Sequence, residues 1–407
     1  MKPTERQQFT QIREQFFTGR AIFLLGPRDG GKQAFLNALL QEVSQRAELS
    51  ADNVLMLNGE DPDQRSRARS LSAKKLLEQR PLLKVLCFLE VQRFPEIDTL
   101  TREILAAHPD LQLLFLSSSR NDTVVRLQEA CAGRRATFHV LPPAMAEHPS
   151  DLNQSMVHGR YPSALEDPAS ASLHLQQILR QTIQKEVLHS GEIRKPDVLD
   201  DLLVLLARNL GNELIIRDLF LALDLDPKTI LRYIGLLEKA FLVFRVPSYF
   251  GFLENEVTAS RKLYFYDNGI RNAILGAYQP VTVRPDAPAL WENFLVSERL
   301  KQLNARRERV GVHYWRSTQR QEVSYLEKRE EGISAWQFNW QGKKPVRFPK
   351  TFTKNYGPVA QEEVRPDNFH DFLGIVPMER VAVPAGEAMT TSMFRNVLAD
   401  LRKKPGK

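Results

Sequence analysis

A glycine-rich segment close to the N-terminus constrains the fold of this chain more than any other feature. Its sequence is Gly26-Pro27-Arg28-Asp29-Gly30-Gly31-Lys32-Gln33, which fits the pattern G-x-x-x-x-G-K. An apolar run over residues 21–25 precedes it, and residues 32–46 carry apolar side chains at helical spacing. Between a strand and a helix, backbone N–H groups can surround phosphate oxygens, and the ammonium of Lys32 can reach the β and γ positions. We therefore expect this segment to bind a nucleotide; the alternative is a glycine-rich turn without a ligand.

Further short apolar runs occupy residues 54–57, 85–89 and 111–116, and stretches with helical spacing separate them. Strands that alternate with helices are typical of a parallel sheet covered by helices on both faces. The N-terminal part is therefore predicted to be an α/β domain. Cys87 lies inside one of these runs, where its side chain is expected to fill the core rather than form a disulfide or bind a metal.

Two positions depart from the residues that usually support Mg²⁺ beside such a loop. Gln33 stands where a Ser or Thr hydroxyl is expected, and Leu89 precedes Glu90 where an Asp-Glu pair is expected. Asp29 also adds negative charge close to the phosphates. Mg²⁺ binding is therefore doubtful, although Glu90 remains a candidate water-activating base. Ser117, Ser118 and Ser119 end the next strand, where they either sense the γ-phosphate or form a plain turn.

The pattern changes after Pro142-Pro143 to helices, predicted over residues 173–186 and 197–210. Helices over 213–223 and 227–240, followed by a strand over 241–246, fit a winged helix-turn-helix. From residue 262 the chain mixes strands with a helix, which predicts a third module. The predicted domains are residues 1–145, 146–260, 261–365 and a C-terminal extension over 366–407.

The chain resembles a group of bacterial and archaeal AAA-type ATP-binding proteins. In that group a P-loop domain, a winged helix and a C-terminal domain related to PD-(D/E)XK nucleases are fused. The resemblance covers about residues 5–357. The segments that carry it are Gly26-Pro27-Arg28 with Gly31-Lys32, Glu90-Val91-Gln92-Arg93-Phe94-Pro95-Glu96, Ala132-Gly133-Arg134, Gly159-Arg160-Tyr161-Pro162, Tyr264-Phe265-Tyr266-Asp267-Asn268-Gly269, Glu292-Asn293-Phe294 and Tyr314-Trp315-Arg316. The resemblance implies ATP or ADP as the ligand and a restriction-endonuclease-like α/β fold for the third domain.

The third domain departs from the acidic motifs of that group, which read Glu-Val-Asp on one strand and Glu-Phe-Lys-Trp on the next. Here the strands read Glu322-Val323-Ser324 and Gln337-Phe338-Asn339-Trp340. The positions of the Asp, Glu and Lys hold Ser324, Gln337 and Asn339, and only Glu292 persists from the acidic cluster. Neutral oxygens lack the charge that dehydrates Mg²⁺. We therefore expect an inactive nuclease-like domain with no metal, beside a P-loop domain with weak or absent ATP hydrolysis.

The distribution of charge suggests a second class of function. The net charge is +7, and residues 299–354 hold 14 Lys and Arg against 5 Asp and Glu. The predicted winged helix carries Lys228, Arg232 and Lys239, and basic and aromatic residues alternate over residues 342–350. The alternative hypothesis is therefore a scaffold that binds duplex DNA or a protein partner, with a vestigial P-loop. A solvated basic face explains the same pattern.

The first residues, Met1 to Gln8, contain no apolar leader, and no stretch approaches the roughly 18 apolar residues that span a bilayer. We therefore expect a cytoplasmic protein without a membrane partner, and the sequence predicts no particular oligomeric state. The histidines show no spacing typical of a zinc site.

Overall fold

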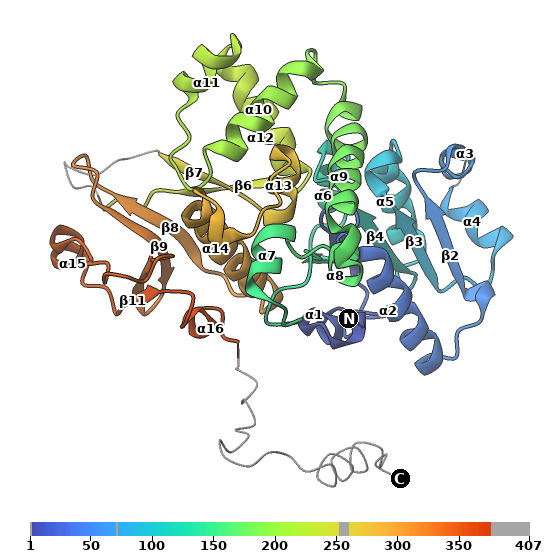
Figure 1. The fold of residues 1–407 in the computed structure, drawn as a ribbon. Coiled ribbons are helices and arrows are strands. Elements are labelled where there is room, and N and C mark those ends of the chain that lie inside the picture. Colours follow the sequence, from blue (N-terminus) through green and yellow to red (C-terminus); the bar gives the residue numbers. More distant parts are fainter. Residues whose placement is uncertain (1, 71, 252–259, 376–407) are drawn as a thin grey trace, which may run out of the picture.

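A computed structural model describes residues 2–70, 72–251 and 260–375 of the chain (Figure 1). The N-terminal part contains a five-stranded parallel sheet in the order β2-β3-β4-β1-β5. Its strands are β1 (Ala21–Leu25), β2 (Val54–Asn58), β3 (Val85–Leu89), β4 (Gln112–Ser117) and β5 (Arg135–His139). The predicted parallel α/β sheet is confirmed, and β5 is an edge strand that the sequence analysis did not predict.

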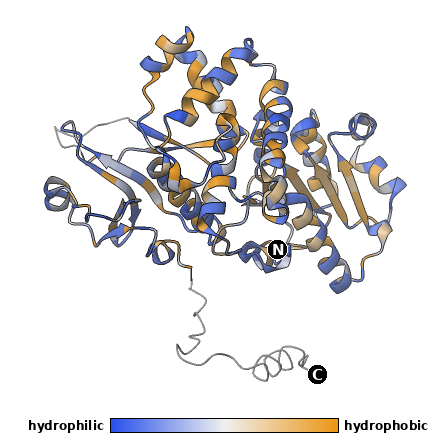
Figure 2. Ribbon diagram, viewed as in Figure 1, coloured by the Kyte–Doolittle hydropathy of each residue, from blue (hydrophilic) through white to orange (hydrophobic). Residues whose placement is uncertain are grey.

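Helices cover both faces of this sheet. Its inner strands β3, β4 and β1 are almost fully buried and mostly apolar (Figure 2), and successive side chains of β1 enter opposite layers of the core. Ile22 and Leu24 pack with Phe35 of α2, and Phe23 packs with Leu100 of α5 on the other face. The helices of this part are α1 (Gln7–Arg13), α2 (Lys32–Arg46), α3 (Pro62–Ser70), α4 (Ala73–Gln79), α5 (Ile97–Ala107) and α6 (Asp122–Ala130).

Cys87 of β3 is a buried, free cysteine, as the apolar run around it predicted. Its burial raises the pKa of the thiol to about 12. The side chain therefore stays protonated and unreactive within the core.

A helical region follows the sheet. It contains α7 (Leu152–His158), α8 (Pro162–Glu166), α9 (Ala171–Thr182), a π-helical turn (Ile183–Val187), α10 (Pro196–Arg208), α11 (Ile216–Leu223) and α12 (Pro227–Lys239). The strand β6 (Val243–Pro247) comes next and pairs antiparallel with β7 (Arg261–Phe265). The two strands pair across residue 260, where the sequence analysis placed a domain boundary.

The last described part is a small mixed-sheet domain in the order β11-β10-β9-β8. Its elements are α13 (Asn268–Leu275), α14 (Ala287–Ala305), β8 (Gly311–Arg316), β9 (Glu322–Arg329), β10 (Gly332–Phe338), α15 (Lys350–Tyr356), β11 (Ala360–Val364) and α16 (Phe369–Phe372). Strands β8, β9 and β10 are antiparallel, whereas β11 runs parallel to β10. The part of the predicted C-terminal extension beyond residue 375 lies outside the described residues. None of the described helices is both long and apolar enough to cross a membrane.

Candidate nucleotide site

The loop between β1 and α2 has the backbone shape that its glycines allow. Gly31 adopts a φ of 96°, a conformation that side-chain-bearing residues rarely adopt. At Gly26 an added Cβ would collide with the carbonyl oxygen of Val140. The two glycines therefore let the loop turn tightly from the strand into the N-terminus of α2, whose first residue is Lys32.

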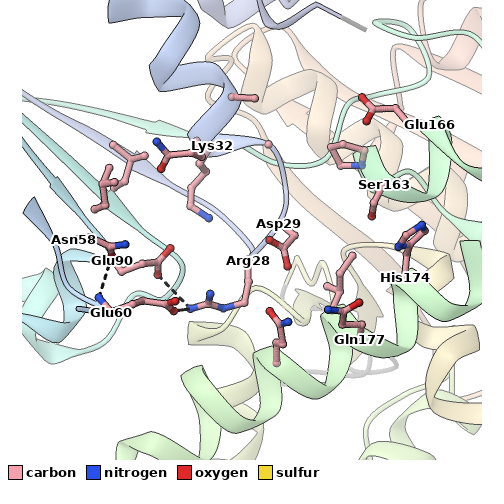
Figure 3. A pocket seen from close by; sticks show the side chains of 18 residues that line it. Arg28, Asp29, Lys32, Asn58, Glu60, Glu90, Ser163, Glu166, His174 and Gln177 are labelled. Carbon is pink, nitrogen blue, oxygen red and sulfur yellow. Dashed lines mark hydrogen bonds and ion pairs between the residues drawn. The ribbon is translucent and has the colours of Figure 1, made fainter. Parts of the chain in front are cut away.

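A cavity of about 590 Å³ lies beside this loop (Figure 3). The loop and the start of α2 form one wall, the ends of β2, β3 and β4 form a second, and α8 and α9 of the helical region form a third. The residues that line it are Arg28, Asp29, Gly31, Lys32, Gln33, Ala34, Asn58, Glu60, Leu89, Glu90, Leu116, Pro162, Ser163, Glu166, His174, Gln177, Ile178 and Gln181. Five residues of the predicted loop thus face one cavity with the candidate base Glu90.

Lys32 is buried, and its ammonium is bound by the loop itself. Nζ donates to the carbonyl oxygens of Gly26 at 2.9 Å and Pro27 at 2.6 Å, and to Oγ of Ser118 at 3.1 Å. Burial lowers the pKa of Lys32, although the negative charges of Glu90 and Glu186 oppose that effect. These contacts are all to oxygens, which a phosphate can replace.

Arg28 lies between three carboxylates. Its Nη2 is 2.6 Å from Oε1 of Glu60, 2.8 Å from Oε1 of Glu186 and 3.6 Å from Oε2 of Glu90. Burial opposes the charge of Arg28, but the carboxylates outweigh burial, so the pKa of the guanidinium is raised. Glu60 follows β2 and Glu90 follows β3, whereas Glu186 comes from the π-helical turn of the helical region.

Glu90 is the acceptor for two further groups. Its Oε1 accepts a hydrogen bond from Oγ of Ser118 at 2.9 Å, and its Oε2 accepts one from Nε2 of Gln92 at 2.7 Å. Of the three serines at the end of β4, Ser118 is hydrogen-bonded to both Glu90 and Lys32. Oγ of Ser117 donates to Oε1 of Gln92 at 2.6 Å. The amide of Gln33 bonds to Oδ1 of Asn37 along α2.

A second, apolar pocket of about 120 Å³ adjoins the loop. Its lining comprises Pro3, Arg6, Gly30, Gly31, Ala34, Phe35, Pro143, His148, Pro162, Leu165 and Glu166, of which four also line the larger cavity. Two of its polar atoms, Nε of Arg6 and Nδ1 of His148, are buried without a hydrogen-bond partner in the described part of the chain. Burial and the nearby Arg160 lower the pKa of His148, which favours the neutral ring. The pocket thus offers a mainly apolar surface, and two of its lining residues each bury one unsatisfied polar atom.

The sequence analysis missed the residues that come from outside the loop. Glu60 follows the end of β2, so the rule that parallel strands end at one edge of the sheet would have found it. Glu186 lies 158 residues from Arg28, and Arg6 and His148 come from opposite ends of the N-terminal domain. No local pattern marks those three residues.

The predicted remnant of an acidic site in the third domain is filled by a lysine. Nζ of Lys262 lies 3.0 Å from Oε1 of Glu292 and 2.5 Å from Oε1 of Glu322. Burial opposes the charge of Lys262, but the two carboxylates prevail and raise its pKa. Oγ of Ser324 donates to Oε1 of Gln337 at 2.9 Å.

Asn339, the third neutral replacement, donates to Oε1 of Glu363 at 2.5 Å. The structure therefore brings Ser324 and Gln337 together and gives Asn339 a separate partner. Across the described residues, no group of three or more His, Cys, Asp and Glu side chains is arranged to hold a metal ion.

One of the basic residues of the predicted winged helix forms an ion pair with the N-terminal domain. Lys239 pairs with Asp122 of α6 at 2.9 Å, so it joins α12 to the N-terminal domain. Lys228 and Arg232 are exposed, and so are Lys343 and Lys344 in the third domain.

Comparisons with known proteins agree with the architecture of the N-terminal half. Residues 18–148 match the AAA domain family, and residues 149–280 match a domain of unknown function (DUF8612). No curated protein matches the chain.

Three solved structures show distant similarity. A structure of PCH-2 from C. elegans is 16% identical, covers 41% of this chain and 45% of its own, and has a TM-score of 0.25. The Aeropyrum pernix ORC1 protein in complex with DNA is 13% identical, covers 67% and 91%, and has a TM-score of 0.29. AMPPCP-bound DnaA from Aquifex aeolicus is 13% identical, covers 57% and 86%, and has a TM-score of 0.28. The sequence match of residues 18–148 is to an AAA domain, which implies ATP or ADP as the ligand, and the match to the domain of unknown function follows directly after it.

Proposed function

We propose that this protein binds ATP or ADP in the two adjoining cavities and hydrolyses ATP weakly or not at all. The observation that carries the proposal is the buried ammonium of Lys32, which faces a cavity of about 590 Å³ at the N-terminus of α2. The loop supplies backbone N–H groups and Lys32 supplies a cation, which together suit a di- or triphosphate. Gly26 and Pro27 contribute the carbonyl oxygens that Lys32 leaves when it turns to a phosphate.

The apolar pocket suits the base of the nucleotide. Phe35 and Leu165 offer apolar contact, and Gly31 and Ala34 line both this pocket and the larger cavity. The unsatisfied Nε of Arg6 is a donor for a ring nitrogen, and Nδ1 of His148 can donate or accept according to its tautomer. A purine base would meet the hydrogen-bonding needs of both atoms.

Weak hydrolysis is proposed because the protein ligands that support Mg²⁺ are replaced. Gln33 and Leu89 stand at those positions, so Mg²⁺ would be held by the phosphates and water. Glu90 faces the cavity as a candidate base, but both of its oxygens already accept hydrogen bonds. A base in that state removes a proton from water less readily than a free carboxylate.

Titration of labelled ATP and ADP tests the proposal. The wild type is expected to bind at tens of micromolar or tighter, and Lys32→Ala to bind at least about tenfold more weakly, because a charge-assisted contact to phosphate is lost. Lys74→Ala is the matched control, since Lys74 is exposed on α4. Absence of saturable binding to the wild type refutes the proposal, and steep dependence on Mg²⁺ favours a working ATPase instead.

We also propose that the third domain is a nuclease-like fold without nuclease activity. The observation in its favour is the pairing of Ser324 with Gln337 and of Lys262 with Glu292, which satisfies these polar groups without a metal. Incubation of DNA with Mg²⁺ or Mn²⁺ is expected to give no cleavage. Cleavage that disappears in Glu292→Gln would overturn this part of the proposal.

A second candidate function is binding of duplex DNA by the third domain. Lys343, Lys344 and Lys350 are exposed together near α15, and no acidic side chain pairs with them among the described residues. Such a patch predicts retardation of DNA that weakens as salt rises. Charge reversal at Lys343 and Lys344, compared with reversal at Lys228 and Arg232, tells which surface contributes. No retardation at low salt would exclude this candidate.

A further inference from the structure

We infer that the contact between Arg28 and Glu186 is a nucleotide-sensitive latch between the P-loop and the helical region. A bound phosphate takes Arg28 from its carboxylates, and the π-helical turn over residues 183–187 loosens as a result. The inference rests on the proposed nucleotide binding and adds to it a route by which occupancy reaches residues 149–280.

Within the described residues, the side-chain partners of Glu186 all come from the N-terminal domain. Its side chain is only 1% exposed, and its partners are Arg28 at 2.8 Å, Gln92 at 3.1 Å and Arg93 at 3.5 Å. The backbone oxygen of the preceding Lys185 also accepts a bond from Arg93 at 2.7 Å. Through this turn the helical region contacts the P-loop directly. The ion pair with Arg28 is the shorter of the two ion pairs of Glu186.

The guanidinium of Arg28 is prepared to accept a phosphate. It lines the larger cavity (Figure 3), and all three of its contacts to carboxylates use Nη2. Its Nε is buried and has no partner in the described parts of the chain. Because a guanidinium binds phosphate and carboxylate with the same two-point geometry, a phosphate competes directly with the glutamates and also satisfies Nε.

The carboxylates can release Arg28 because each has a second partner. Lys185 lies 2.9 Å from Glu60, and Ser118 and Gln92 donate to Glu90. Glu186 keeps Gln92 and Arg93 but loses its shortest contact. No bare buried carboxylate is left, so the two arrangements of Arg28 have comparable hydrogen bonding, as a two-state element requires.

The negative charge of a bound phosphate favours the transfer of Arg28 from the glutamates to the ligand. Neither Gln33 nor Leu89 brings a metal to the phosphates, so their charge is met by Lys32 and Arg28. By linkage, a nucleotide that weakens the contact between Arg28 and Glu186 must bind more tightly when that contact is already absent. Glu186 is thus a positioning residue that holds Arg28 away from the ligand.

The test compares three substitutions in the full chain by ADP titration without Mg²⁺. Glu186→Gln is expected to bind at least about fivefold more tightly than the wild type, the lower end of ordinary coupling. Glu166→Gln, which removes one charge from the same cavity without touching Arg28, should change affinity less. Glu60→Gln should also tighten binding, because it frees Arg28, and it additionally removes the ion pair with Lys185 of the π-helical turn.

Hydrogen exchange over residues 183–190 provides the second readout. In the wild type, ADP should speed exchange there, and Glu186→Gln should show the faster exchange without ADP. Wild type that binds ADP with unchanged exchange at 183–190, or equal affinities of Glu186→Gln and Glu166→Gln, overturns the latch alone. Wild type that binds no nucleotide overturns the proposed function and the latch together. The wild-type exchange experiment decides the matter even if Glu186→Gln fails to fold.

Discussion

The nucleotide site and the third domain each bury one basic side chain among carboxylates, but the two clusters differ in what surrounds them. Arg28 shares Glu60, Glu90 and Glu186, borders a large cavity and keeps an unsatisfied Nε. Lys262 lies between Glu292 and Glu322, and its side chain is only 1% exposed. The first arrangement can exchange partners with a ligand, whereas the second is closed.

The difference shows two ways in which a cluster of carboxylates can be neutralised by one basic side chain. Buried carboxylates need a cation, because an unpaired buried charge is strongly destabilising. In the third domain a lysine of β7 meets that need and ties the hairpin to α14 and β9. In the P-loop domain an arginine meets it and remains within reach of the ligand.

The largest expected effect is on stability in the third domain. Lys262→Met should lower the free energy of unfolding by about 3–4 kcal/mol, because the partly buried Glu292 loses its cation and Glu322 keeps only Arg316 at 3.7 Å. Elsewhere in the described structure no cation pairs with Glu292. Urea unfolding measures the change, with exposed Lys343→Met as the control. A loss below about 1 kcal/mol would contradict the view that this cluster is closed.

The next effect concerns the open cluster. Arg28→Ala should lower the free energy of unfolding by only about 1–3 kcal/mol, because Glu60, Glu90 and Glu186 keep other partners. The same variant should bind nucleotide more weakly than the wild type. Arg46→Ala, an exposed arginine on α2, is the control for both measurements. A loss as large as that of Lys262→Met would remove the distinction between the two clusters.

The smallest expected effect is in the dependence of stability on pH. The cluster of Arg28 should contribute to it at acid pH and the cluster of Lys262 at alkaline pH. Burial raises the pKa of Glu60, but its bonds to Lys185 and Arg28 outweigh burial, so the pKa lies below 4.5. Its stabilisation is therefore present above pH 4.5 and is lost as pH falls through the lowered value. Lys262, with a pKa raised above 10.5, stabilises below pH 10.5 and loses this effect as pH rises through the raised value.

Unfolding measured across pH provides the check. Glu60→Gln should flatten the acid limb relative to the wild type and leave the alkaline limb unchanged. Lys262→Met should flatten the alkaline limb only. Superimposable curves for the wild type and both variants would show that neither cation interacts with its carboxylates in the expected way.

The parallel sheet could be predicted where its strands are continuously apolar, as in β1 and β3. The sequence analysis missed β5 because this edge strand has only two buried apolar residues, Ala136 and Phe138, and the residues on either side of them are charged or polar. β11 and α15 escaped for a similar reason, since Val364 and Phe352 are the buried residues among otherwise polar ones. Short segments on the rim of a sheet bury too little to leave a periodic pattern.

The loop residues of the site could be predicted because their chemistry is local, and the partners of Arg28 could not. Glu186 is one polar residue within a helical pattern, and nothing in that pattern distinguishes a solvated glutamate from a buried one. Lys262 was hidden in the same way, because it follows Arg261 at the start of a strand and nothing local marks which of these two basic residues is buried. Contacts between charges that are distant in sequence require the fold itself.

The pairing of β6 with β7 determines how this chain can be divided into fragments. A cut at residue 260 would strip β6 of its partner and leave the backbone groups that β6 pairs with β7 open along an apolar edge, which promotes association between chains. The complementary fragment would begin on an unpaired strand that carries Lys262. A recombinant fragment that ends after Phe265 retains the hairpin and avoids both exposed edges.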